Sequence, residues 1–129
     1  MKMTTNDISY KTVRAAAILT NSYVAGTVLE NCQNYNSLSL NIAFTKGSLT
    51  DCQIKIEVSK DGTNYLPLTV DAFTAGVNSP VSLIYKFTAD ASVSTNQLPI
   101  LTKYIKISAI GTGTVTSSSL AIDAVLGEI

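Results

Sequence analysis

The chain is short of the side chains that enzymes and metal sites use most often. Its 129 residues include no histidine, no tryptophan and two cysteines, and its only arginine is Arg14. Histidine is the commonest general base near neutral pH and the commonest metal ligand, so its absence removes both roles. No serine lies in a G-x-S-x-G elbow, and no motif places another base beside a nucleophile. We therefore expect no enzyme activity, no catalytic residues, no metal site and no cofactor.

Charge is also scarce, and it is balanced. Charged residues make up 14% of the chain, and its nine basic and nine acidic side chains cancel. A nucleic-acid binder needs a strongly basic face and a peripheral membrane protein needs a basic cluster, and this composition offers little material for either. No run of about 18 apolar residues could span a bilayer. We expect neither nucleic acid nor a membrane as a partner.

Three short features have both a functional and a structural interpretation. Residues 61–64 (Asp-Gly-Thr-Asn) could offer oxygen atoms to a weakly bound calcium ion, although this pattern is more typical of a tight turn. Residues 111–114 (Gly-Thr-Gly-Thr) are superficially similar to a phosphate-binding loop, but they lack its lysine and the helix that follows. Cys32 and Cys52 could form a disulfide, and we expect two free thiols.

The dominant pattern in the sequence is an alternation of apolar and polar residues. In residues 37–44 and 52–58 every second residue is apolar, as a β-strand with one face in the core and one in water requires. Residues 61–62 (Asp-Gly) mark a turn, and residues 65–70 return as the partner strand. Pro67 cannot donate a hydrogen bond, so this strand is expected at an edge or at a bulge.

Alternation continues to the end of the chain and predicts the fold. Further strands are expected at residues 14–20, 23–30, 81–88, 104–108 and 114–126. Eight or nine short strands separated by Gly, Asn, Asp and Ser favour a β-sandwich or a closed barrel. We predict an all-β fold, a single antiparallel, jelly-roll-like β-sandwich. The residues expected in its core are Leu40, Ile54, Ile56, Ile105, Ile107 and Ile122.

The beginning of the chain differs from the rest. Residues 1–12 show little apolar periodicity, so we predict a flexible N-terminal arm at 1–12 and the sandwich domain at 13–129. Ile8 and Tyr10 are two residues apart and would share one face if the arm became extended, for example by adding a strand to a neighbouring subunit. Ile8, Tyr10 and Arg14 are therefore the candidate assembly contacts.

A carbohydrate site is the alternative that the residues leave open. Sugar sites use exposed aromatic rings beside amide groups, and three tyrosines have asparagine neighbours in expected loops. These residues are Tyr23, Tyr35 and Tyr65 with Asn21, Asn34, Asn36 and Asn64. Tyrosine at a strand end also serves as half-buried packing, so a glycan is an alternative partner rather than the first expectation.

Residues 36–42, 54–65 and 103–120 together resemble small β-sandwich virion proteins of tailed bacteriophages, a group that includes capsid decoration (cement) proteins and other accessory structural proteins. The same strand-and-turn pattern also resembles discoidin-like sugar-binding sandwiches, and no functional residue carries over from either group. The first resemblance implies a non-enzymatic virion protein made in the host cytoplasm, forming a homo-oligomer and contacting the major capsid protein or other virion proteins. The alternative is a carbohydrate-binding module on a tail, neck or cell-surface assembly.

Overall fold

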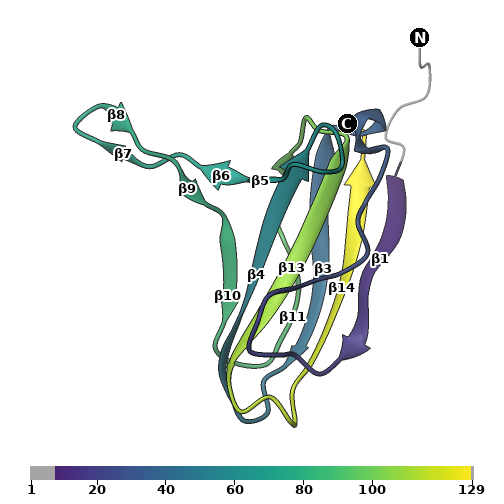
Figure 1. Cartoon of the computed structure of the whole chain (residues 1–129), viewed down its shortest axis with the longest axis vertical. Helices are drawn as coiled ribbons and strands as arrows, with labels where there is room; N and C mark the ends of the chain where they lie inside the picture. Colours follow the sequence, from purple (N-terminus) through teal and green to yellow (C-terminus); the bar gives the residue numbers. More distant parts are fainter. Residues whose placement is uncertain (1–7, 129) are drawn as a thin grey trace.

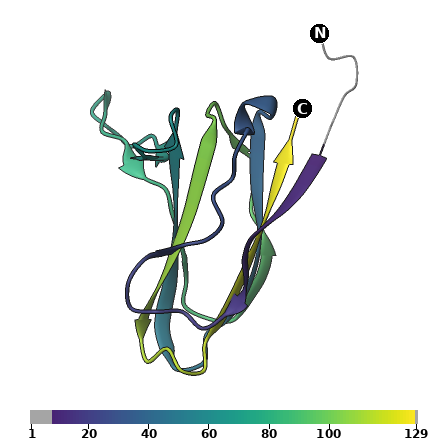
Figure 2. The same cartoon turned by 45° about the vertical axis from the view of Figure 1, so that its right-hand side comes forward.

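The computed structural model describes residues 8–128, which form two antiparallel sheets packed as a sandwich (Figures 1 and 2). We call them sheet A and sheet B. Sheet A has the strand order β1 (Ile8–Ala17), β14 (Ser119–Gly127), β3 (Ser37–Thr45) and β11 (Ala91–Ser94), and β12 (Leu98–Pro99) also pairs with β3. Sheet B has the order β10 (Ile84–Phe87), β4 (Leu49–Ser59), β13 (Tyr104–Gly113) and β2 (Val24–Ala25), and β5 (Leu66–Pro67) also pairs with β4. A short 3₁₀ helix, η1 (Cys32–Asn34), precedes β3.

The core lies between the long strands β3 and β14 of sheet A and β4 and β13 of sheet B. The predicted alternation is confirmed, because all six residues expected in the core are no more than 1% exposed. On β4, Cys52, Ile54 and Ile56 face inward and are buried. Gln53, Lys55 and Glu57 alternate with them and are partly exposed. The alternation of apolar and polar residues therefore determines which face of each strand is buried, and with it the register of the strands.

The sandwich is divided into more strands than predicted. Fourteen strands lie in residues 8–128, because several are only two residues long. The segment expected as a strand at 23–30 contains only β2 and an isolated bridge between Leu29 and Ile105. The strand expected at 14–20 ends at Ala17, and β11 and β12, which are four and two residues long, were not predicted.

The sandwich already includes Ile8, five residues before the predicted start at residue 13. The first five residues of β1 pair with β14, from Ile8 opposite Gly127 to Thr12 opposite Asp123. An edge strand gains its backbone hydrogen bonds from one neighbour and can leave most side chains in water, so weak apolar periodicity did not reveal it. The rest of the predicted flexible arm, residues 1–7, lies outside the described residues, and its flexibility stays a prediction.

Between β5 and β10 the chain leaves the sandwich. Here β6 (Thr69–Val70) pairs with β9 (Val81–Ser82), and β7 (Phe73–Thr74) pairs with β8 (Val77–Asn78). Residues 66–83 form a narrow hairpin that extends sideways from one end of the sandwich (Figure 1). We call it the projecting arm. The predicted strand at 65–70 pairs with β4 only through β5, where Pro67 occupies the expected edge position opposite Glu57.

Within residues 8–128, the structure contains no helix with the length and apolar character needed to cross a membrane.

Candidate functional site

The predicted assembly contacts lie on β1, at the edge of sheet A. Ile8 is 56% exposed and Tyr10 is 70% exposed. They stand opposite Gly127 and Val125 of β14, and two-residue spacing along a strand places both side chains on one face. The structure therefore brings these two residues together on an accessible surface, although within the sheet of their own subunit.

Arg14 makes its contacts inside the chain. Its Nε donates to the carbonyl oxygen of Leu120 at 3.0 Å, and its Nη2 donates to those of Ala17 at 3.2 Å and Ile18 at 2.8 Å. These bonds join the end of β1 to β14 beside two register shifts. Partial burial lowers the pKa of the guanidinium from its ordinary value. Arg14 therefore stabilises the end of β1 within its own chain, and its contact with another subunit stays a prediction.

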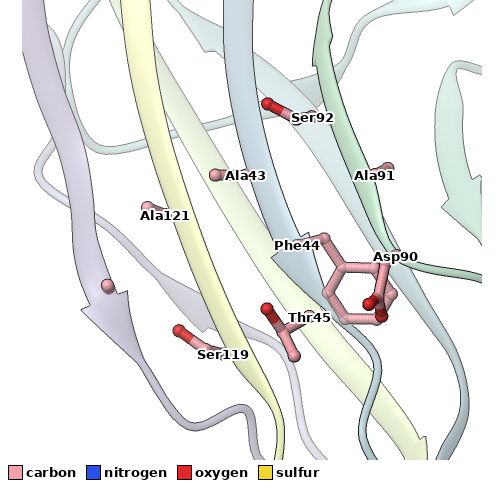
Figure 3. Close-up of a pocket in the computed structure, with 9 residues that line it drawn as sticks. Ala43, Phe44, Thr45, Asp90, Ala91, Ser92, Ser119 and Ala121 are labelled. Carbon is pink, nitrogen blue, oxygen red and sulfur yellow. The ribbon is translucent and has the colours of Figure 1, made fainter.

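The outer face of sheet A is hollowed and lined by small side chains. Figure 3 shows Ala43 and Thr45 on β3 beside Ala121 and Ser119 on β14, and these residues pair directly across the strands. The hollow measures ≈ 450 Å³. Asp90 is the single ionisable side chain in its lining, and its Oδ1 accepts the backbone N–H of Lys46 at 2.8 Å. The other polar side chains of the lining are the hydroxyls of Thr45, Ser92 and Ser119, so its one charged group is already engaged by the backbone of the chain itself.

Residues 61–64 form a turn whose carboxylate is occupied by the chain itself. Asp61 Oδ1 accepts hydrogen bonds from the backbone N–H groups of Thr63 and Asn64 and from the hydroxyl of Ser59, and Oδ2 accepts one from the Asn64 side chain. The bonds from Asn64 and Thr63 hold the pKa of Asp61 well below its ordinary value. Gly62 has the positive φ of 78° that the Asp-Gly pattern predicted. The structural interpretation of this motif is thereby supported.

Residues 111–114 are not arranged as a phosphate cradle. The backbone N–H of Gly111 donates to the carbonyl oxygen of Thr20 at 2.8 Å. The carbonyl oxygens of Gly111 and Gly113 accept from Asn21 Nδ2. A Cβ atom on Gly111 would lie 3.0 Å from Leu49 Cδ2 and 3.1 Å from Leu19 Cβ. Gly111 therefore lies in a closely packed position beside Leu19 and Leu49.

The three tyrosines of the sugar hypothesis do not all lie on one surface. Tyr35 packs against the core, whereas Tyr23 and Tyr65 each lie beneath a lysine on the outer side of sheet B. Lys55 Nζ is 4.3 Å from the centre of the Tyr23 ring, and Lys106 Nζ is 4.3 Å from that of Tyr65.

Glu57 lies between these two lysines. Its Oε1 is 3.7 Å from Lys55 Nζ and 3.9 Å from Lys106 Nζ. The ion pairs join the two cation–π contacts into one row across β4 and β13. In that row, one face of each tyrosine ring is already covered by an ammonium group and is not available to stack on a sugar.

Both cysteines are free and fully buried in the core. Burial raises the pKa of each thiol to about 11. For Cys52, the charge of Asp51 raises the pKa further, and a hydrogen bond with the Phe87 backbone partly opposes the shift. Thiols of this kind are inert packing groups rather than nucleophiles. Among residues 8–128, no group of three or more His, Cys, Asp or Glu side chains is placed to hold a metal ion.

The projecting arm is the surface that sequence reasoning missed. Residues 65–70 and 81–88 were predicted as strands of the sandwich, and residues 71–80 were not assigned, but the structure leaves most of the apolar side chains of the arm in water. The exposed ones are Leu66, Val70, Phe73, Val77 and Val81. At the base of the arm a further hollow of ≈ 370 Å³ is lined by Val58, Leu66 and the fully exposed Leu101, among others. Exposed apolar surface of this extent is typical of interaction sites.

Comparison with known proteins gives similarity in fold and none in sequence. No protein-family model and no curated protein sequence matches the chain. The SPBc2 prophage-derived protein YomS matches with a TM-score of 0.61 at 14% identity, over 99% of both chains. The infectious bursal disease virus Gx strain and a VP2 subviral particle of that virus contain chains that match with TM-scores of 0.53 and 0.54, at 11% and 10% identity. Both matches cover 95% of this chain, which spans only about a third of those viral chains (32% and 33%). This likeness confirms the predicted fold, a jelly-roll-like antiparallel β-sandwich.

Proposed function

We propose that the chain is a non-enzymatic structural protein of a virus particle, namely a capsid decoration or stabilising protein of a tailed phage. The observation that carries the proposal is the similarity of fold, along its whole length, to a prophage-derived protein. The likeness to chains of infectious bursal disease virus supports it from a second direction. The sequence resemblance to small virion sandwiches points the same way.

The surfaces of the sandwich support a role in assembly. Ile8 and Tyr10 offer an accessible apolar pair at the edge of sheet A, and the projecting arm offers a second apolar surface. A chain of net charge zero can also be packed in many copies without mutual repulsion. In this proposal the partners are the major capsid protein or other virion proteins and further copies of the chain, and its location is the virion.

The direct test is electron microscopy of particles produced by the genome that encodes the chain, with an affinity tag on the chain and a gold label on the tag. Regular labelling over the capsid surface is the expected result. Labelling confined to one vertex would keep the virion role but replace decoration by a place in the neck or tail. Purified particles that contain no labelled chain would overturn the proposal. Specific binding on a glycan array, together with that absence, would favour the carbohydrate-binding module instead.

A second test addresses the contact surface on β1. The double variant Ile8→Ser, Tyr10→Ser should fold normally, because both side chains are exposed, and should bind purified particles more weakly than the original chain. The matched control is Val93→Ser, which changes an exposed apolar residue on β11, at the other edge of the same sheet. Equal particle binding by all three proteins would exclude Ile8 and Tyr10 as contacts.

A further inference from the structure

The projecting arm continues the apolar face of the core beyond the end of the sandwich. Leu68 and Leu83 stand at its base, where the N–H of Leu83 donates to the carbonyl oxygen of Leu68 at 2.8 Å, and both side chains pack against the core. Val70 and Val81 are two residues further along the two strands and lie directly opposite each other. Two-residue spacing places them on the same face as the leucines. Here, however, no part of the sandwich covers that face, and both valines are exposed.

The arm is unusually poor in charge for a segment so exposed. Asp71 is its single charged residue between positions 66 and 83. The carboxylate of Asp71 accepts a hydrogen bond from the Asn78 side chain, whose oxygen in turn accepts the backbone N–H of Ala72. This polar group closes the hairpin below its tip, and Phe73, which is 66% exposed, lies beyond it in the last paired stretch before the turn. An isolated two-stranded hairpin is marginally stable in water, so an uncovered apolar arm indicates a missing partner.

The chain itself contains a surface that suits the tip of the arm. The hollow at the base of the arm, with Val58, Leu66 and Leu101 among its lining residues, is large enough at ≈ 370 Å³ to receive an aromatic side chain. Val58 and Leu66 place this hollow at β4 and β5, and the arm extends away from these strands (Figure 1), so its own tip cannot reach the hollow. The tip of the arm of another copy can reach this hollow. The arm spans about 30 Å from Leu66 to its turn, so two arms laid side by side in opposite directions would bring each tip to the other base.

We propose that two copies of the chain form a two-fold symmetric dimer through their projecting arms, with Phe73 of each copy in the base hollow of the other. A two-fold arrangement uses the same surface on both subunits and covers both tips at once. The apolar side chains that it would cover in each copy are Leu66, Val70, Phe73, Val77, Val81 and Leu101. Twelve such side chains at roughly 100 Å² each amount to about 1,200 Å², which reaches the size of a specific protein interface.

Two further features favour a second copy of the chain as the partner, with contact made through side chains of the two arms. The chain carries no net charge, so two copies do not repel each other at long range. Pro67 lies in β5 and Pro80 lies between β8 and β9, and proline along an exposed edge blocks open-ended pairing with other strands. Contact through the apolar face therefore closes into a dimer and does not extend into a fibre. The dimer does not depend on the proposed virion function, because it forms in the purified chain.

The test is sedimentation analysis of the purified full chain over a range of concentrations. We expect a monomer–dimer equilibrium whose Kd rises by roughly thirtyfold or more in Phe73→Ser, since a buried aromatic anchor carries much of an interface's affinity. Leu101→Ser should have the same direction of effect. The matched control Ile18→Ser changes an exposed apolar residue away from the arm and should leave the Kd unchanged. A monomer at every concentration, or a dimer unaffected by Phe73→Ser, would overturn the proposal.

Cross-linking checks the geometry separately. A Phe73→Cys chain mixed with a Leu101→Cys chain should form a disulfide-linked heterodimer under mild oxidation, and the two native thiols should not compete because both are fully buried. The same Phe73→Cys chain mixed with Ile18→Cys should form no heterodimer above background. Equal cross-linking in both mixtures would reject the tip-to-base contact. Circular dichroism of each variant shows that the fold is retained, as exposure of all three positions leads us to expect.

Discussion

Asp61 accepts the backbone N–H of Asn64 through Oδ1 at 2.8 Å, in the turn between the end of β4 and the start of the projecting arm. The same oxygen accepts the backbone N–H of Thr63 at 2.9 Å and the hydroxyl of Ser59 at 2.9 Å. One carboxylate thus satisfies donors on both sides of the turn. The ionised carboxylate of Asp61 therefore stabilises the turn that precedes the projecting arm.

Replacing Asp61 by asparagine should lower the melting temperature at neutral pH and flatten its dependence on acid. The folded chain lowers the pKa of Asp61, so the stabilisation is present above the unfolded value of about 3.9 and is lost as the pH falls below it. Melting curves between about pH 5 and pH 2 would measure the difference. Asp123→Asn, on the outer face of sheet A, is the matched control. Parallel acid profiles for Asp61→Asn and the original chain would contradict this account.

Truncating Ile56 to alanine should cost about 2–5 kcal/mol of the free energy of unfolding, because the side chain is 1% exposed and its removal leaves a cavity. Denaturant titration of the purified variant gives the value. Ile18→Ala makes the same chemical change at an exposed position and should stay within about 0.5 kcal/mol of the original chain. If the two variants were equally stable, the assigned register of β4 would be wrong.

Gly111→Ala should also destabilise the fold. The new Cβ would sit at 3.0 Å from Leu49 and 3.1 Å from Leu19, and overpacking of this kind typically costs about 1–3 kcal/mol. Thermal melting with and without inorganic phosphate separates packing from anion binding. A melting temperature lowered by the same amount in both buffers is expected. Phosphate that raised the melting temperature of the original chain but not of the variant would restore the phosphate-loop hypothesis.

Sequence reasoning succeeded where burial is one-sided and regular. Ile54 and Ile56 had to alternate with polar residues, because one face of β4 meets the core and the other meets water, and that pattern fixes strand, face and register together. The Asp-Gly turn was predictable for a different reason, since Gly62 alone tolerates its positive φ there at little cost.

The features that were missed depend on relationships between distant segments. Ile8 joins β1 because β14, more than a hundred residues later, offers an open edge. Val70 and Val81 look like ordinary core residues of a strand, and only the geometry of the arm reveals that nothing in their own chain covers them. Alternation predicts that a face is apolar but cannot say whether the partner of that face belongs to the same molecule.

The buried thiols give a prediction for alkaline pH. Burial raises the pKa of Cys32 and Cys52 to about 11 in the folded chain, well above the ordinary value of a thiol. A raised pKa means that the folded state favours the neutral thiol, so this stabilisation is complete below about pH 8.5 and is lost as the pH rises through 11. Denaturant midpoints should fall between about pH 8.5 and pH 10.5, and they should fall less in a Cys32→Ala, Cys52→Ala double variant.

The same burial makes the thiols unreactive in the native protein. Only the thiolate attacks an alkylating reagent, and at about pH 8 each cysteine is both neutral and fully covered by its neighbours. Iodoacetamide should therefore leave the native chain unmodified and label both cysteines once guanidinium unfolds it, as intact mass spectrometry would show. Rapid labelling of the native chain would mean that one thiol is accessible. An unreduced mass lower by two hydrogen atoms, with no labelling even after unfolding, would mean that Cys32 and Cys52 form a disulfide and that the packing assigned to both is wrong.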